Sequence, residues 1–446
     1  MTATDLGSAW TSIPGPDGDG LAEIAAAGGL HNYQLRLHAE YGSVVRFPLP
    51  GVPRAVSVAD PVLLEPVARI DARPDALFEF LAPLQESGNL QTMDAAEHVP
   101  WRRVLLSVLA GRSSHERHFA EFVALTEDVA DRWAAAGGPI ALQQDLSELS
   151  LRMICAYALG AGWRSGERAG RVVAAFEEVL TEYLGRLYET DSGDGAGGVR
   201  AEGALAYLRA TVDDILAAHR RDARIPGDDS DLIAALAAAG QPPARIRDTV
   251  LMIMLAAHHT TGVAVSWTLY LLAQHPAIAD RVAAELAEVL GDRTPEYRDL
   301  KRLTYLRMVL QESMRLYTPG PYGAREATED MAVGRYPIPA GTTIFLPFRA
   351  IHMNPEYWPA PDRFDPDRFA PEPSAARHRY AYLPFGLGPR GCEGAALAMV
   401  EAELVLAVLI RRFRFEPVAG HPVTPIERFV LWAADDIRVH LTPRTR

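Results

Sequence analysis

The stretch from Leu251 to Ala273 contains no Asp, Glu, Lys or Arg, and this run constrains the fold more than any other feature of the chain. A run of this length can span a bilayer as a helix. Its middle, however, reads His258-His259-Thr260-Thr261, which would place polar side chains where lipid penalises them most. A helix that is apolar on all sides is also expected at the centre of a large soluble protein. Because Pro242-Pro243 precedes the run and Pro276 follows it, we predict a buried central helix of about thirty residues and no membrane span.

The rest of the chain indicates a mainly helical protein with a small β portion. Apolar residues recur at three- and four-residue spacing from Trp101 to Leu290, which is typical of helices packed on a core. Strand-like runs at Ser43–Pro48 and Arg54–Val58 flank a turn with Gly and Pro, as in a hairpin, and another lies at Thr342–Pro347. We therefore predict one domain over residues 1–446, β-rich at approximately 43–60 and 320–350 and helical elsewhere.

Composition excludes some classes of function and suggests a compartment. The formal net charge is −13 and the basic residues form no block, which argues against general nucleic-acid binding. The chain has only two cysteines, Cys155 and Cys392, so a disulfide scaffold is excluded and a reducing cytoplasm is expected. Residues 1–16 lack a basic start followed by an apolar run, so we expect no signal peptide or N-terminal anchor.

The segment from Phe385 to Gly394 reads F-G-L-G-P-R-G-C-E-G and places Cys392 directly before a long helical pattern. A thiolate is a natural soft ligand for haem iron, and the amides and dipole of a helix N-terminus favour its negative charge. Glycines without Cβ atoms let the backbone turn tightly and lie close to a flat macrocycle. Arg390 lies two residues before the cysteine and can reach a haem propionate with charge-assisted hydrogen bonds.

This segment resembles the cysteine-ligand loop of the cytochrome P-450 family. The resemblance implies the family's fold, in which a long central helix lies over a haem b and the cysteine loop lies beneath it. It implies that Cys392 is the axial ligand of the haem iron and that Phe385 and Arg390 belong to the haem site. Cys155 lies in a helical run and is instead expected to be a small buried hydrophobe. The matching positions are Phe385, Gly386, Gly388, Arg390, Cys392, Gly394, Leu397, Ala398 and Glu401.

Glu312 and Arg315 are three residues apart on one predicted helix and therefore share a face. With Arg368 they resemble the Glu-Arg-Arg network of the same family, in which a buried triad fixes the segment behind the haem. We assign these residues a structural role, because removing one partner would leave a buried charge unpaired.

Further residues match the propionate-binding positions of the family. His98 and Arg102 are four residues apart and face the same way if the segment is helical, although Pro100 between them requires that helix to begin nearby. Arg325 follows the proline-rich bend and matches another such position. The resemblance implies that His98, Arg102 and Arg325 bind the haem.

The middle of the central helix matches the family's oxygen-activating motif with two departures. Thr260 matches the alcohol that helps to deliver protons to dioxygen, whereas Ala257 replaces the usual Gly and His259 replaces the usual acid. The same His-Thr pairing occurs in sterol 14α-demethylases, and histidine can also relay protons. We therefore predict that Thr260 and His259 are catalytic. His258 and His259 lie about 100° apart around the helix, so they cannot both face the haem, and the sequence leaves open which one does.

The resemblance implies a haem-thiolate monooxygenase that hydroxylates or epoxidises a small apolar molecule with dioxygen. No nucleotide-binding fingerprint of a fused reductase is present, so a separate ferredoxin and ferredoxin reductase are expected as electron donors. The alternatives are a peroxide-driven or isomerase-type haem-thiolate enzyme and a non-catalytic haem sensor. Apolar candidate substrate walls favour a terpenoid, polyketide or steroid-like secondary metabolite: Phe78–Leu84, Phe176–Tyr183, Leu255–Thr260, Pro319–Tyr322 and Val430–Trp432.

Overall fold

The computed structural model describes residues 10–159, 166–187, 196–221 and 231–444, and these form a mainly helical protein with small sheets. The first helices are α2 (Leu21–Ala27), α3 (Leu30–Tyr41), α4 (Ala95–Leu109), α5 (Arg112–Ala135), α6 (Leu142–Ala158), α7 (Gly166–Leu187), α8 (Ala196–Arg221) and α9 (Leu232–Ala238). They are followed by α10 (Pro243–Gln274), α11 (Pro276–Leu290), α12 (Thr304–Leu316), α13 (Phe348–His352), α14 (Pro371–Ala376) and α15 (Ala395–Arg412). The predicted fold class is confirmed.

The strands form one sheet of four strands and three smaller pairings. The larger sheet has the order β1-β2-β7-β4, in which β2 and β7 are parallel and the other neighbours are antiparallel. The strands are β1 (Val44–Leu49), β2 (Val52–Val58), β3 (Ile140–Ala141), β4 (Gly323–Glu326), β5 (Met331–Val333), β6 (Tyr336–Ile338), β7 (Thr343–Leu346), β8 (Phe413–Pro417), β9 (Pro425–Arg428), β10 (Val430–Ala433) and β11 (Arg438–Pro443).

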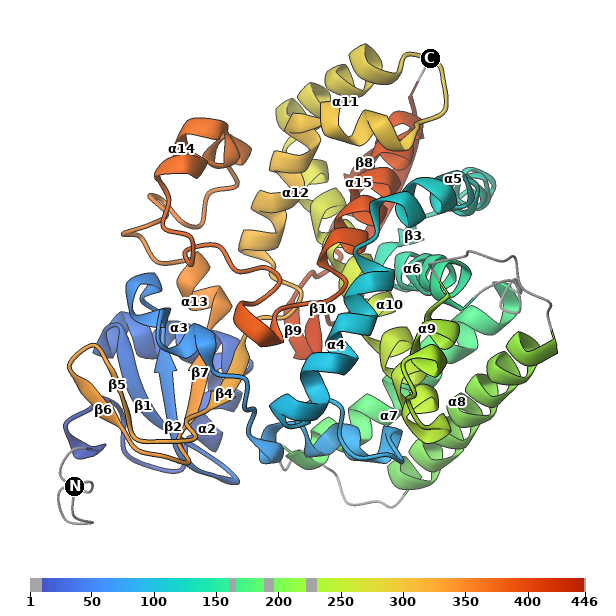
Figure 1. Cartoon of the computed structure of the whole chain (residues 1–446). Coiled ribbons are helices and arrows are strands. Elements are labelled where there is room, and N and C mark those ends of the chain that lie inside the picture. The colour runs from blue at the N-terminus through green and yellow to red at the C-terminus, as the bar shows by residue number, and fades with distance from the viewer. Residues whose placement is uncertain (1–9, 160–165, 188–195, 222–230, 445–446) are drawn as a thin grey trace.

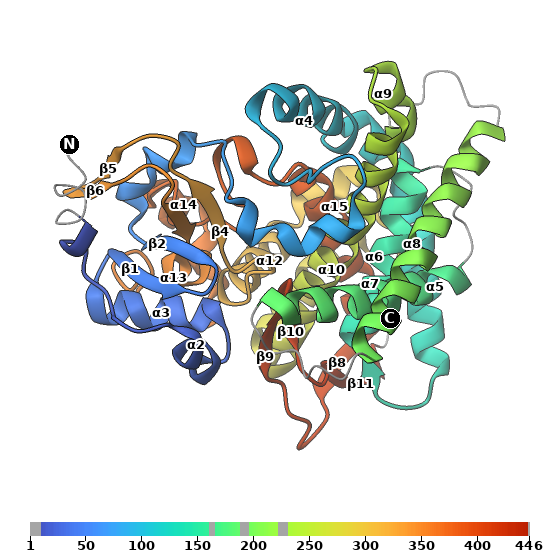
Figure 2. The ribbon, with the colours of Figure 1, turned by 90° about the horizontal axis from the view of Figure 1, so that it is seen from below.

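The larger sheet brings the start of the chain next to residues almost three hundred positions later, because β2 pairs with β7 from Ala55↔Thr343 to Ser57↔Phe345. Figures 1 and 2 show this sheet with α2, α3 and α13 on one side of the molecule, and most of the long helices on the other. The strands β1, β2 and β4 to β7 fall in the two predicted β-rich ranges. β3 and the strands between residues 413 and 443 lie outside the predicted β-rich ranges.

The central apolar run lies in α10, as predicted. The helix begins after Pro242, whose backbone is extended, and ends at Gln274 because His275 precedes Pro276 and leaves the helical region. Within the described residues, α10 is the one helix that is both long enough and apolar enough to cross a membrane. However, 78% of its most apolar 18-residue window is buried inside the protein. This burial is the property expected of a core helix.

The backbone of α6 lies directly against α10. A Cβ added at Gly262 on α10 would be 2.8 Å from the amide nitrogen of Ser147 on α6, so the absence of a side chain permits this close approach. The hydroxyl of Ser150 donates a hydrogen bond to the carbonyl of Ala257 at 2.9 Å across the same interface. The crossing therefore fixes both the position and the rotation of α10.

A buried ion-pair network fixes the irregular segment that follows α13. Arg315 and Glu312 on α12 are fully buried and form a bidentate pair at 2.7 and 2.8 Å. Arg315 also donates to the carbonyl of His352 at 2.9 Å, and Arg368 forms an ion pair with Glu312 at 3.3 Å. The network joins α12 to residues far along the chain, which is consistent with the structural role predicted for these three residues.

Candidate functional site

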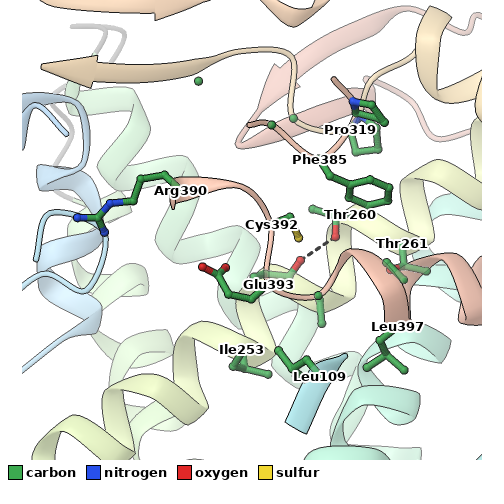
Figure 3. Close-up of a pocket in the computed structure, with 18 of the residues that line it drawn as sticks. Leu109, Ile253, Thr260, Thr261, Pro319, Phe385, Arg390, Cys392, Glu393 and Leu397 are labelled. Carbon is green, nitrogen blue, oxygen red and sulfur yellow. Dashed lines mark hydrogen bonds between the residues drawn. The ribbon is translucent and has the colours of Figure 1, made fainter. Parts of the chain in front are cut away.

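A cavity of about 370 Å³ lies between α10, the segment around Cys392 and strand β4. Figure 3 shows the Cys392 sulfur together with Thr260, Phe385, Leu109 and Ile253 on its walls. The lining is mainly apolar, with charged side chains gathered near the cysteine segment. The cavity combines an apolar interior with few polar groups, which is typical of a binding site for a small molecule or cofactor.

The segment before α15 forms a tight loop that opens the Cys392 side chain onto this cavity. Gly388 has φ of +66°, and a Cβ there would lie 1.9 Å from the carbonyl oxygen of Ala68, so no other residue fits without moving the backbone. The amide of Cys392 donates to the carbonyl of Phe385 at 2.9 Å, which closes the loop. The thiol is accessible from the cavity although protein surrounds the residue closely.

The surroundings of the Cys392 thiol oppose its ionisation. Burial, followed by the charge of Glu393, raises its pKa from 9.0 to about 11. The backbone amides of Gly394 and Ala395 donate to the sulfur and lower the pKa, which is the predicted effect of the helix start. Burial outweighs them. A metal cation would reverse the balance, because a thiol that coordinates a metal ion is deprotonated.

Three arginines and a histidine gather at one side of the cavity. Arg325 is buried and donates to the carbonyls of Ala324 and Leu387, both at 2.8 Å, while its Nε has no hydrogen-bond partner in the structure. Burial first, and then the nearby cations Arg73 and Arg390, lower the pKa of Arg325 from 12.5 to about 9. Burial and the charge of Arg390 lower the pKa of Arg73 from 12.5 to about 10. Such a cluster is destabilised by its own charge and would be relieved by an anion.

Asp71 holds two members of this cluster. It accepts from His98 Nδ1 at 3.0 Å and forms an ion pair with Arg390 Nε, also at 3.0 Å. Burial and the charge of Arg390 lower the pKa of His98 to about 4, so the imidazole is neutral at physiological pH. His98 and Arg390, both predicted to bind the haem, line the cavity.

Arg102 lies elsewhere. Its guanidinium donates to the carbonyl of Gly391 at 2.6 Å and pairs with the carboxylate of Glu393, and it is not among the residues that line the cavity. In this geometry Arg102 stabilises the cysteine loop, and its predicted contact with the cofactor stays a prediction. Arg73 takes the place at the cavity, from an irregular segment whose sequence carried no signal of this role.

The predicted catalytic residues of α10, Thr260 and His259, lie on different faces of the helix, and only Thr260 lines the cavity. Ile253, Ala257, Thr260 and Ala264 line the cavity at three- and four-residue spacing, and Thr260 donates to the carbonyl of Ala256 at 2.8 Å. His258 and His259 lie outside this face and are buried.

The two histidines pack on other side chains rather than on the cavity. The ring of His258 stacks on Phe176 with centroids 5.1 Å apart, and that of His259 lies 5.3 Å from Trp432. Burial lowers the pKa of both, so both are neutral at physiological pH. The expectation that one of them faces the haem is corrected by this arrangement, and a relay through His259 has no support in it.

The predicted substrate walls are partly at the cavity. Pro319 and Tyr322 line it, as expected, whereas Phe176 and Trp432 pack on the histidines. Phe429, at the turn between β9 and β10, lines the cavity although it was not among the predicted walls.

The groups around the cavity fit a haem. A thiol opens onto it beside an apolar helix face, and a cluster of cations with unpaired donors suits the carboxylates of the macrocycle. Cys392 would ligate the iron, and Arg73, Arg325, Arg390 and His98 would bind the carboxylates. Phe385, predicted to belong to the haem site, also lines the cavity.

Comparison with known proteins gives a family and several relatives. The model of the cytochrome P-450 family matches residues 21–440. The chain is 36% identical over 231 residues to cyclooctat-9-en-7-ol 5-monooxygenase of Streptomyces melanosporofaciens, covering 50% of each chain. It is 34% identical over 252 residues to cyclooctatin synthase of the same organism, covering 55% of this chain and 54% of the relative. With cytochrome P-450 4c3 of Drosophila melanogaster the identity is 38% over 203 residues, covering 45% and 38%. The matches thus span about half the length of these curated relatives or less.

Proposed function

The chain belongs to the cytochrome P-450 family, and on that premise we propose that it is a haem-thiolate monooxygenase acting on a small apolar molecule. When bound, haem b supplies the activation of dioxygen and the insertion of one oxygen atom into the substrate. The observation that carries the proposal is the Cys392 thiol opening onto a cavity that also holds the cationic cluster.

The residues of this chain hold and orient the reacting groups. Cys392 provides the thiolate, Arg102 keeps its loop in place through Gly391 and Glu393, and the apolar face of α10 excludes water. Thr260 holds a proton at Oγ1, which in the resting geometry is donated to the Ala256 carbonyl. Rotation about its χ1 bond would direct this proton into the cavity, so we assign Thr260 the role of proton donor.

The substrate that the apolar walls favour is a terpenoid or a similar secondary metabolite. Two Streptomyces relatives support this class, since one is named as a monooxygenase of cyclooctat-9-en-7-ol and the other as cyclooctatin synthase. We further propose cytoplasmic location, and electron supply by a separate ferredoxin and its reductase.

Carbon monoxide tests the thiolate assignment directly. The reduced protein with carbon monoxide should show the red-shifted Soret band of thiolate-ligated haem. Cys392→Ser should abolish the band, whereas Cys155→Ala, at a buried cysteine away from the cavity, should retain it. Persistence of the band in Cys392→Ser would refute the proposal.

The role of Thr260 is tested by coupling of reductant use to product. Thr260→Ala should release more peroxide per reductant consumed. Thr268→Ala is the matched control, because Thr268 makes the same bond to Ala264, at 2.7 Å, on the same helix and does not line the cavity. Equal coupling in both variants would contradict the assignment.

A peroxide-driven enzyme is the second candidate, and one observation favours it. His259, which stands where the family has an acid, lies outside the cavity, so along the cavity-lining face of α10 the side-chain proton donors are Thr260 and Thr261 alone. If the enzyme is peroxide-driven, turnover with peroxide should match or exceed turnover with ferredoxin, its reductase and dioxygen. Much faster turnover with ferredoxin, its reductase and dioxygen would support the monooxygenase.

A further inference from the structure

A second cavity of about 150 Å³ adjoins the first. Gly320, Tyr322, Gly323 and Phe429 line both cavities, so the two spaces meet at these residues. Leucine and aromatic side chains from α3, the sheet and the segment around η4 (Glu79–Leu84) form most of the second wall. The remaining described residues of this wall are Leu30, Leu49, Pro50, Leu77, Phe78, Phe80, Pro321, Ala324, Phe345 and Glu427.

Glu427 is the one charged side chain among the described residues of the second wall. Its side chain is 10% exposed, and its carboxylate accepts from His31 Nδ1 at 2.9 Å and from the amide of His31 at 3.1 Å. Tyr322 donates its hydroxyl to the other carboxylate oxygen at 2.5 Å. A buried carboxylate carries a desolvation cost that apolar residues of the same size avoid, so its presence in an apolar wall calls for a reason. An ionised carboxylate only accepts hydrogen bonds, and it therefore selects partners that donate.

Phe429 stands between the two spaces in a strained backbone conformation. It occupies the turn between β9 and β10 with φ of +64°, which bulky residues rarely adopt. Its ring packs edge-on against Phe80 with centroids 6.2 Å apart. Strain held by surrounding structure at a shared cavity wall is common where a side chain must point in one direction for binding. Phe429 thus gives both cavities an apolar wall at the place where they meet.

We propose that the second cavity receives the far end of an elongated substrate that carries a hydroxyl there, and that Glu427 accepts the hydrogen bond of this hydroxyl. The apolar body of the substrate passes Phe429 and reaches the first cavity, so the hydroxyl sets which carbon lies near Cys392. The inference rests on the proposed function and narrows its substrate class to apolar molecules with a distal alcohol. A substrate ending in a carboxylate is rejected, because its charge would lie beside that of Glu427.

The probes are three ligands with one apolar chain and different ends: dodecanol, its methyl ether, and dodecanoate. Binding to the ferric holoenzyme is followed by the change in haem absorption and, independently, by titration calorimetry. The alcohol should bind about tenfold more tightly than the ether, which cannot donate, and dodecanoate should bind most weakly. Comparing alcohols from octanol to hexadecanol should give an optimum length, because both ends of the chain are positioned.

Glu427→Gln keeps the size of the side chain and removes its charge. Dodecanoate should then bind about tenfold more tightly than to the wild type, while the ether is unaffected. Asp435→Asn is the matched control, since it removes a charge from an exposed position just after β10 and should change no affinity. If Glu427 merely ties the hairpin to α3, the variant will weaken all three ligands alike, and the proposal fails.

The wild-type series needs no variant and decides the question even if Glu427→Gln does not fold. Equal affinity for alcohol, ether and carboxylate overturns the inference. The carbon monoxide spectrum of the same preparation distinguishes failure of the proposed function from failure of the role of Glu427. A missing thiolate band refutes the proposed function, whereas a normal band without end-group selectivity refutes only the role of Glu427.

Discussion

Replacing Arg325 by Met should accelerate haem loss while sparing the fold. In the structure Arg325 is 2% exposed, and burial beside Arg73 and Arg390 lowers its pKa from 12.5 to about 9. At 1.36 kcal/mol per pKa unit, keeping this group charged costs about 5 kcal/mol as an upper bound. An anion bound at this place removes some or all of that cost, so the same energy favours haem binding.

The loss of haem-binding free energy in Arg325→Met is expected to be smaller than this upper bound. The hydrogen bonds from Arg325 to the carbonyls of Ala324 and Leu387 disappear as well, and a charge-assisted hydrogen bond to a carboxylate contributes about 1.5–3 kcal/mol. We therefore expect a loss of about 2–4 kcal/mol in haem affinity, or roughly 30- to 1,000-fold. Transfer of haem to an excess of apomyoglobin measures the dissociation rate.

Arg349→Met provides the matched control for this experiment. Arg349 is a part-buried arginine with bonds to Asn32 at 3.1 Å and to the carbonyl of Leu316 at 2.9 Å, but it does not line the cavity. It should lower the stability of the fold and leave haem loss within a few-fold of the wild type. The reasoning is refuted if Arg325→Met loses haem at the wild-type rate, or no faster than Arg349→Met.

Three further predictions concern stability. Gly262→Ala should lower the free energy of unfolding by about 1–3 kcal/mol in urea titrations, because its Cβ would meet the backbone of Ser147 at 2.8 Å. Glu312→Gln leaves the fully buried Arg315 without its ionic partner and should cost about 3–5 kcal/mol, measured as loss of folded, haem-loaded protein. Burial raises the pKa of Glu401 from 4.5 to about 8, so the unfolded state releases this proton first and stability should fall as pH rises from 4.5 to 8. Glu401→Gln should remove that slope and be the more stable protein above pH 8 by a few kcal/mol; parallel pH profiles would contradict this.

The features predicted correctly depend on local chemistry. The charge-free run and its flanking prolines predict the bounds of α10 closely, because prolines end helices wherever they stand. Glycines around Cys392 predict the tight loop, and the helical pattern after it predicts α15. Glu312 and Arg315 share a helix face at three-residue spacing, so their pairing also follows from local geometry.

The short strands were harder to predict. β3 has two residues, and the strands β8 to β11 have four to six, in a segment with few clear alternations of apolar and polar side chains. β9 and β10 pair with each other across Phe429, but β3, β8 and β11 pair with strands farther along the chain, as where Val439 of β11 pairs with both Ile140 and Pro417. Stability of such strands comes from cross-strand contacts rather than from the preferences of their own residues.

The sequence by itself determined which chemistry is present: one thiol in a glycine-rich loop, several arginines around it, and an alcohol in the middle of an apolar helix. It could not determine where each side chain points. One of His258 and His259 was expected at the haem, but packing of α10 against α6, Phe176 and Trp432 sets the rotation of the helix and turns both histidines away. Arg73 lines the cavity, whereas the guanidinium of Arg102 is held by the carbonyl of Gly391 and the carboxylate of Glu393. The local sequence of Arg102 does not specify these tertiary partners. A helix turns about 100° per residue, so one position in the sequence separates a wall of the cavity from the protein core, and only tertiary contacts decide between them.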